Sequence, residues 1–190
     1  SSVNPVFIQT DITDEISIIK SMNFLLKEDI YIRGLINNAA RNPTVSSKGL
    51  EKSNRLEKFD INEWEKDIKV GLTGAFLCTK IIGSYMNLNK GGSIINISSD
   101  LGLIAPNQNL YKKDNLQDTE QFVKPISYSV IKSGLIGMTR YTSTYWPLKV
   151  RCNCLCPGGV YTDQPQDFLN KISELIPMQR MAKREEYKER

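Results

Sequence analysis

The chain has 190 residues, of which 40% are hydrophobic, and this content is enough to bury one substantial core. We therefore expect a single domain over residues 1–190. Lysine and arginine number 25 against 21 aspartates and glutamates, which gives a net charge of +4 spread along the chain. The densest basic run, residues 183–190, is interleaved with acids, which is typical of a solvated helix face and excludes a dedicated nucleic-acid site.

Membrane and secretory classes are also excluded by the sequence. No stretch approaches the ~20 apolar residues of a membrane span, and the first residues do not resemble a secretory signal. We expect a cytoplasmic protein with no membrane partner. The chain contains no histidine, so Ser-His-Asp hydrolysis and every imidazole-based scheme are excluded. Any general acid must be a tyrosine, lysine, cysteine or carboxylate.

Strands and helices are predicted to alternate along the chain. Short β-branched runs predict strands, apolar residues at helical spacing predict helices, and Asp60 and Pro147 mark the start and end of two of the helices. The predicted order is strand 6–9, helix 16–26, strand 34–37, helix 61–86, strand 93–97, helix 127–146 and strand 150–155. This alternation predicts βαβ units, and hence an α/β fold with a doubly wound parallel sheet.

Polar and small residues follow each predicted strand. Right-handed crossovers bring the carboxyl ends of parallel strands to one edge of the sheet, where ligands bind. The residues expected at that edge are Thr10-Asp11, Asn38-Ala39-Ala40, Ser98-Ser99 and Pro157-Gly158-Gly159. Two polar loops, 41–55 and 106–125, interrupt the pattern, and loops this long within a compact domain are often functional.

Three cysteines alternate along the last predicted strand. Cys152, Cys154 and Cys156 would share one face of that strand. A zinc site needs four ligands from at least two segments, and same-face neighbours on a strand are too far apart for easy disulfides. We interpret these cysteines as small hydrophobic side chains in a reducing compartment, and we expect no metal.

Tyr128 and Lys132 carry the first chemical signal. A spacing of four residues on a helix places the phenol and the ammonium on one face. A nearby cation favours the phenolate, so the tyrosine could exchange a proton with an alcohol or ketone near neutral pH. Taken alone, the pair could equally be an ordinary exposed one. Ser99 supports the first interpretation because it ends a buried strand, where its hydroxyl could bind the substrate oxygen; Ser98 would point to the opposite face.

Five linked segments resemble the short-chain dehydrogenase/reductase family. They are the 91–99 run Gly-Gly-Ser-Ile-Ile-Asn-Ile-Ser-Ser, the Tyr-x-x-x-Lys pair at 128 and 132, and the 153–162 run Asn-Cys-Leu-Cys-Pro-Gly-Gly-Val-Tyr-Thr, together with Thr-Asp-Ile-Thr at 10–13 and Leu-Ile-Asn-Asn-Ala-Ala at 35–40. Trp64, Gly74 and Phe76 fall where the family has similar residues. The resemblance covers essentially the whole chain in the right order.

The resemblance implies a Rossmann-like fold and an NAD(P)-dependent oxidoreductase that acts on the carbonyl or alcohol group of a small molecule. Tyr128 would be the general acid/base, Lys132 would hold the nicotinamide ribose and lower the pKa of the tyrosine, and Ser99 would orient the substrate oxygen. Together with Tyr128 and Lys132, the implied cofactor contacts are Asp11 and Ile12 at adenine, Asn38 and Ala39 at the adjoining ribose, and Pro157, Gly158, Val160 and Thr162 at the nicotinamide end. Residues 163–181 would be a flap over the substrate, or else a plain surface helix and loop.

Three departures from the family pattern qualify this assignment. Gly71 stands where the family usually has an asparagine that supports a proton relay from the lysine. Residues 107–126 form an insertion before the catalytic helix, and the run from Ser99 through Tyr111 resembles members linked to bacterial surface-sugar pathways, such as nonulosonic acid synthesis and flagellin modification. The family's first two strands, with their Gly-rich turn, and its last strand are missing, so we expect a segment of a longer polypeptide.

The remaining alternatives follow from these departures. The choice between NAD and NADP is open, because the discriminating residues follow the missing second strand. A catalytically silent member that binds a nucleotide or a partner is the runner-up, favoured by Gly71. Apolar residues on the helices at 61–86 and 127–146 predict either a homodimer or homotetramer, as in the family, or packing within one chain.

Overall fold

A three-stranded parallel sheet lies at the centre of the computed structural model, which describes residues 5–41 and 54–187. The strands are β1 (Gly34–Asn37), β2 (Gly92–Ile97) and β3 (Val150–Leu155), in the order β1-β2-β3. Gly34 pairs with Ser93 and Gly92 pairs with Val150, and both pairings are parallel. The predicted parallel α/β architecture and three of its four strands are confirmed.

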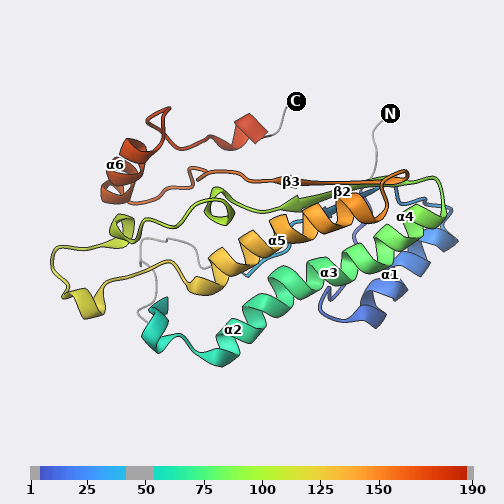
Figure 1. Cartoon of the computed structure of the whole chain (residues 1–190), viewed down its shortest axis with the longest axis horizontal. Coiled ribbons are helices and arrows are strands. Elements are labelled where there is room, and N and C mark those ends of the chain that lie inside the picture. The colour runs from blue at the N-terminus through green and yellow to red at the C-terminus, as the bar shows by residue number, and fades with distance from the viewer. Residues whose placement is uncertain (1–4, 42–53, 188–190) are drawn as a thin grey trace.

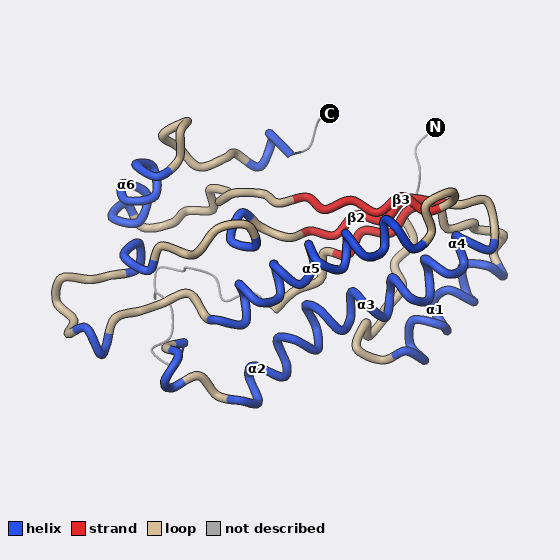
Figure 2. Tube along the Cα trace, viewed as in Figure 1, coloured by secondary structure: helices blue, strands red, loops and turns tan. Residues whose placement is uncertain are grey.

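One long helical rod and one separate helix run side by side along the sheet (Figures 1 and 2). The rod consists of α2 (Ile61–Ile68), α3 (Gly74–Cys78) and α4 (Ser84–Leu88), which are joined by π-helical turns. The separate helix is α5 (Ile126–Tyr145), and α1 (Glu15–Lys27) packs against the rod near α3. Figure 1 shows α1 to α5 on the same side of the sheet, while α6 (Gln166–Leu175) lies beyond the carboxyl ends of the strands.

Aspartates begin two of these helices, because the first amides of a helix lack partners within it. The Asp14 carboxylate accepts hydrogen bonds from the amides of Ile16 and Ser17. The Asp60 carboxylate does the same for the amides of Asn62 and Glu63. In the described parts of the chain, no helix is both long and apolar enough to cross a bilayer.

Residues 6–9 are an exception to the predicted strands. The segment is extended but joins no sheet, so the prediction of a strand there is wrong for this structure. Its β-branched side chains favour an extended backbone, but a strand also needs a neighbour to accept and donate hydrogen bonds. The adjoining Thr10 is held instead by the Ser21 hydroxyl of α1, at 2.6 Å.

Two hydrophobic clusters fix the layers together. Met86, Ile94, Val150 and Cys152 form the cluster between α4 and the sheet, with Trp146 packed against it. Ala75, Ile131 and Leu135 form the second cluster, between α3 and α5. The face of β3 that points away from this cluster is exposed, so buried and exposed side chains alternate along the first four residues of the strand.

A buried amide links the sheet to α5. Asn96 of β2 is fully buried; its Oδ1 accepts a 2.8 Å hydrogen bond from Asn37 Nδ2, and its Nδ2 donates to Thr139 Oγ1 at 2.8 Å. Asn37 in turn donates to Thr79 Oγ1 of the rod, at 3.1 Å. Asn96 and Asn37 together therefore connect two strands with α5 and the helical rod through buried hydrogen bonds.

We expect Asn96→Ala to lower the free energy of unfolding of the full-length protein by about 1–3 kcal/mol, because it removes one buried hydrogen bond from Asn37 Nδ2 and one to Thr139 Oγ1. Chemical denaturation followed by circular dichroism measures this change. The exposed Asn23 on α1 provides the matched control, and Asn23→Ala should stay within about 0.5 kcal/mol of wild type. Equal stability of the two variants would contradict the role assigned to Asn96.

Candidate active site

The start of α5 meets the end of β2 through two hydrogen bonds that run in opposite directions. Ser98 Oγ donates to the carbonyl oxygen of Lys132 at 2.7 Å, and Lys132 Nζ donates to the carbonyl oxygen of Ile97 at 2.8 Å. Gly102 permits this approach, since a Cβ there would lie 2.8 Å from the carbonyl oxygen of Lys132. Lys132 is therefore buried beside the carboxyl end of the central strand.

The structure brings Ser99, Tyr128 and Lys132 together at this junction. Ser99 lies near enough to the Tyr128 phenol to lower its pKa in part, and Lys132 Nζ lies 5.6 Å from the centre of the tyrosine ring. Ser98 points the other way, into its bond with the α5 backbone. The predicted division between the two serines therefore agrees with the geometry, and alternation along the strand explains it.

The protonation behaviour of Tyr128 differs from the sequence-based expectation. Burial raises the pKa of Tyr128; the hydrogen bond from Ser99 lowers it in part, and the negative charge of Asp100 raises it further. Burial also lowers the pKa of Lys132. In the chain alone, Lys132 Nζ is directed at the Ile97 carbonyl and desolvation of the phenol dominates, so the lowering of the Tyr128 pKa by Lys132 stays a prediction.

Three further ionisable side chains near Tyr128 were not predicted as site residues. Lys124 Nζ lies over the tyrosine ring, 3.9 Å from its centre, and burial lowers the pKa of Lys124 to about 8. Burial raises the pKa of Tyr111 to about 12, with contributions from Tyr128 and Asp100. Asp100 directly follows Ser99, so its place beside the site could be predicted from the sequence. Lys124 and Tyr111 are brought there by the fold of the 106–125 loop, which could not be predicted.

The 106–125 loop contacts α6 as well as the site. The Tyr111 and Phe168 rings lie 5.8 Å apart, and Lys171 Nζ donates to the carbonyl oxygen of Lys112 at 2.8 Å. The loop contains two short 3-10 turns, Gln108–Tyr111 and Asp118–Glu120. The segments predicted as insertion and flap therefore form one wall beside Tyr128.

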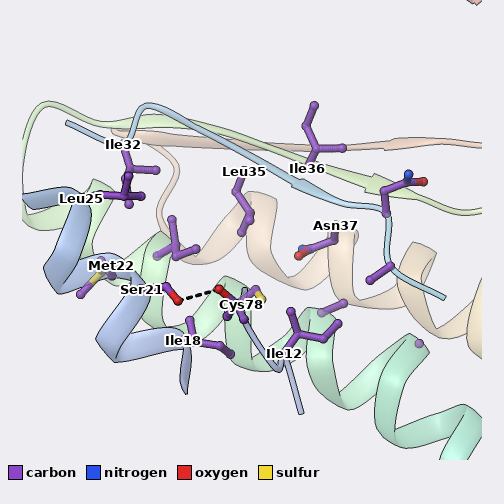
Figure 3. Close-up of a pocket in the computed structure, with 16 residues that line it drawn as sticks. Ile12, Ile18, Ser21, Met22, Leu25, Ile32, Leu35, Ile36, Asn37 and Cys78 are labelled. Atoms are coloured by element: carbon purple, nitrogen blue, oxygen red, sulfur yellow. Dashed lines mark hydrogen bonds between the residues drawn. The ribbon is translucent and has the colours of Figure 1, made fainter. Parts of the chain in front are cut away.

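The residues predicted at the adenine end lie at the neighbouring strand. Ile12, Asn38 and Ala39 line a cavity of about 230 Å³ between α1, β1 and α3. Figure 3 shows its largely apolar wall, with Leu35 and Asn37 of β1 on one side and Ile18, Ser21, Met22 and Leu25 of α1 on the other. Asp11 is exposed and lies outside this lining; its carboxylate is bonded to the amide and hydroxyl of Thr13, which lowers the pKa of Asp11.

The residues predicted at the nicotinamide end follow β3. The Pro157 carbonyl oxygen accepts a 3.0 Å hydrogen bond from the amide of Asp100, so this segment lies directly beside Ser99. Gly158 is exposed, and a Cβ there would have only Asp100 Oδ2 within 4 Å, at 3.7 Å. Val160 and Thr162 lie farther along the chain from Ser99. Val160 forms a parallel β-bridge with Ala182, and the Thr162 amide donates a 2.7 Å hydrogen bond to Gln164 Oε1.

The arrangement of these groups fits a dinucleotide laid across the sheet edge. Asn38, Ser99 and Pro157 follow the adjacent strands β1, β2 and β3, so their segments lie in that order along one edge. Ala39 and Gly158 are small and exposed, which lets a ligand approach the backbone closely. Lys132 Nζ has donors to spare beyond its single bond to Ile97, as a ribose contact requires.

The cysteines are free thiols. Cys152 is buried, and Cys154 and Cys156 are half-buried, with their sulfur atoms 3.9 Å apart on the Lys132 side of the strand. Across the residues that the structure describes, no three cysteine, aspartate or glutamate side chains gather in a way that could hold a metal ion.

Gly71 is buried on the rod, facing α5. A Cβ at this position would lie 2.8 Å from Ile131 Cγ2 and 3.0 Å from Ile131 Cδ1. The room that a side chain would need is therefore occupied by isoleucine, which is stiff at χ1 and itself buried. An asparagine could not stand here without displacing α5.

We expect Gly71→Asn to lower the free energy of unfolding by about 1–3 kcal/mol through overpacking against Ile131. Gly137→Asn is the matched control, because a Cβ at Gly137 meets nothing within 4 Å. Adding Ile131→Ala to Gly71→Asn should cost less than the sum of the two single changes, since the cavity accepts the new side chain. Strict additivity in denaturant titrations would show that the two residues do not compete for the same space.

Comparison with known proteins gives two matching families. The family described as "short chain dehydrogenase" matches residues 2–112, and the family described as "Enoyl-(Acyl carrier protein) reductase" matches residues 117–189. A 3-oxoacyl-[acyl-carrier-protein] reductase of Synechocystis is 30% identical over 145 residues, covering 75% of this chain and 52% of that protein. A cis-4-hydroxycyclohexanecarboxylate dehydrogenase of Sinomonas cyclohexanicum is 28% identical over 191 residues, covering 97% and 66%.

Solved structures agree with these matches. A short-chain dehydrogenase of Leptospira borgpetersenii with bound NAD+ is 26% identical with a TM-score of 0.77, covering 92% of this chain and 62% of the other. ElxO with bound NADP is also 26% identical, with a TM-score of 0.71, covering 94% and 65%. The chain spans about half the length of the first two curated relatives, 55% and 52%.

Proposed function

Because this chain belongs to the short-chain dehydrogenase family, we propose that it forms the catalytic part of an oxidoreductase that moves hydride between a nicotinamide cofactor and a small carbonyl or alcohol substrate. Tyr128 is the general acid/base, Ser99 orients the substrate oxygen, and Lys132 holds the nicotinamide ribose. The observation that carries the proposal is the convergence of these three side chains at the carboxyl end of β2.

The geometry assigns each group one task. In the oxidation direction the Tyr128 phenolate would accept the proton of the substrate hydroxyl. The bound nicotinamide cofactor would supply the hydride chemistry at the carbon that carries this hydroxyl. Ser99 binds the substrate oxygen from the end of the strand. Because burial keeps the pKa of Tyr128 high in the chain alone, approach of the Lys132 ammonium in the bound state is the step that favours the phenolate.

The predicted cofactor contacts support either NAD or NADP. Ile12, Asn38 and Ala39 would receive the adenosine half, and Pro157 and Gly158 the nicotinamide half, with Asp11, Val160 and Thr162 at the margins of the site. Relatives in the structural comparison bind each of the two cofactors.

The wall formed by the 106–125 loop and α6 is proposed to select the substrate. Its polar lining beside Tyr128, from Tyr111 and Lys124, supports a polar, sugar-derived substrate such as one from a surface-sugar pathway. Exposed aromatic side chains on the rod and on α5, namely Phe76, Tyr141 and Tyr145, support a homodimer or homotetramer formed through these helices.

The second candidate is a catalytically silent family member, and Gly71 is the observation in its favour. Full-length protein can be assayed with NAD+ or NADP+ against 3-hydroxyacyl-CoA thioesters, cyclic hydroxy acids and sugar derivatives. Turnover of any of these supports the enzyme; cofactor binding without turnover of any of them supports the silent member.

We expect Tyr128→Phe to reduce kcat at least about 100-fold while leaving the fold intact, because only the proton-exchanging group is removed. Tyr31→Phe, at an exposed tyrosine apart from all the predicted site residues, is the control and should retain full activity. Circular dichroism checks the fold and steady-state kinetics the rate. Wild-type kcat in Tyr128→Phe would refute the mechanism.

We expect Lys132→Ala to weaken both cofactor binding and rate, because it removes the ribose contact and the cation near the phenol. Quenching of protein fluorescence by NADH or NADPH measures the dissociation constant. The exposed Lys20 on α1 supplies the comparison variant, Lys20→Ala. An unchanged cofactor dissociation constant in Lys132→Ala would count against the ribose role.

A further inference from the structure

Lys124 brings an ammonium group to the reacting tyrosine, and the proposed proton and hydride steps give it no task. Its Nζ lies over the Tyr128 ring, 3.9 Å from the ring centre. The other lysine near this ring, Lys132, donates to the carbonyl oxygen of Ile97 and is the proposed ligand of the cofactor ribose. The site therefore has a second cation, which comes from the 106–125 loop.

The backbone around Lys124 fixes where this ammonium lies. The Lys124 amide donates a 2.9 Å hydrogen bond to Gln108 Oε1 across the loop. The next residue, Pro125, is fully buried and is the N-cap of α5. A residue before proline is restricted to extended backbone. The side chain of Lys124 therefore leaves the chain at a defined place, beside the first turn of the helix that carries Tyr128.

The charges around Lys124 favour an anion beside it. Burial lowers the pKa of Lys124 to about 8, the positive charge of Lys132 lowers it further, and the negative charge of Asp100 offsets part of this change. The Asp100 carboxylate also accepts hydrogen bonds from Ser99 Oγ at 2.7 Å and from the amide of Leu101 at 2.8 Å. A half-buried cation is stabilised when an anionic group binds next to it, because the attraction compensates for lost hydration.

We infer that Lys124 is a specificity-determining residue that binds an anionic group of the substrate, a carboxylate or a phosphate, while the reacting hydroxyl or carbonyl lies at Tyr128. This inference rests on the proposed function and narrows its substrate class. Because the ammonium lies over the ring of the reacting tyrosine, the anionic group must be attached close to the reacting carbon. A short hydroxy acid or a phosphorylated sugar meets this requirement.

Protection of Lys124 from acetylation tests anion binding in the full-length protein without turnover. A bound anion stabilises the ammonium form, which does not react with acetic anhydride, and peptide mass spectrometry measures the labelling of each lysine. Relative to sodium chloride at equal ionic strength, we expect sodium phosphate or sodium butyrate to slow the labelling of Lys124 about threefold or more. Protection by only one of the two salts identifies the anionic group as phosphate or carboxylate.

Lys113 is the matched internal control for this measurement. It belongs to the same loop, and its ammonium lies over the Phe122 ring instead, 5.5 Å from the ring centre. Its labelling should be the same in all three salts. Equal labelling of Lys124 in the three salts would overturn the inference.

Kinetics with matched charged and neutral substrates tests whether the bound anion belongs to the substrate. The pairs are 3-hydroxybutyrate with 3-hydroxybutyramide, and glucose 6-phosphate with glucose. We expect Lys124→Met to reduce the preference in kcat/KM for the charged member about 10–100-fold, because it removes a hydrogen bond between charged groups. Lys124→Arg should keep most of the preference, and Lys113→Met should keep all of it. A merely structural role of Lys124 would change the values for both members alike.

The outcomes separate this inference from the proposed function. A preference that is unchanged in Lys124→Met, or turnover of neutral substrates alone, would refute only the role of Lys124. Protection of Lys124 in a protein that turns over neither these pairs nor the substrates named above would refute the proposed function, and with it the substrate role of the anion.

Discussion

The crossing of α5 over the end of β2 sets the positions of Ser99, Tyr128 and Lys132 at this edge of the sheet. Ser98 Oγ holds the Lys132 carbonyl, and Lys132 Nζ holds the Ile97 carbonyl, so strand and helix each donate to the other's backbone. Tyr128 lies one helical turn before Lys132, which places its phenol at the strand end near Ser99. The Ser98 bond is buried and the Lys132 bond is partly buried, so losing the first would leave an unpaired buried polar group.

The two serines at the end of β2 divide structural and chemical work. Ser98 faces the helix backbone and supports the junction, whereas the Ser99 hydroxyl donates to Asp100 near Tyr128. Two residues earlier than Ser98, Asn96 faces the same helix and links it to β1. One face of a single strand thus positions α5, and the opposite face at its end presents the hydroxyl that the proposed chemistry uses.

Much of this arrangement could be predicted from local sequence. Strand alternation separates Ser98 from Ser99, and Asp14 and Asp60 mark helix starts by their capping chemistry. Features that depend on contacts between residues far apart in the sequence could not be predicted. Residues 6–9 have the composition of a strand but no neighbour in the sheet, and the pKa of Tyr128 depends on burial that no residue spacing encodes. Lys124 reaches the tyrosine ring only because of how the 106–125 loop folds.

A crystal structure of the full-length protein with NAD+ or NADP+ tests the central claim most directly. The account predicts the nicotinamide ribose within hydrogen-bonding distance of Lys132 Nζ and the nicotinamide ring facing the Tyr128 hydroxyl beside Ser99. A cofactor bound elsewhere on the molecule, with Ser99, Tyr128 and Lys132 untouched by it, would contradict the account.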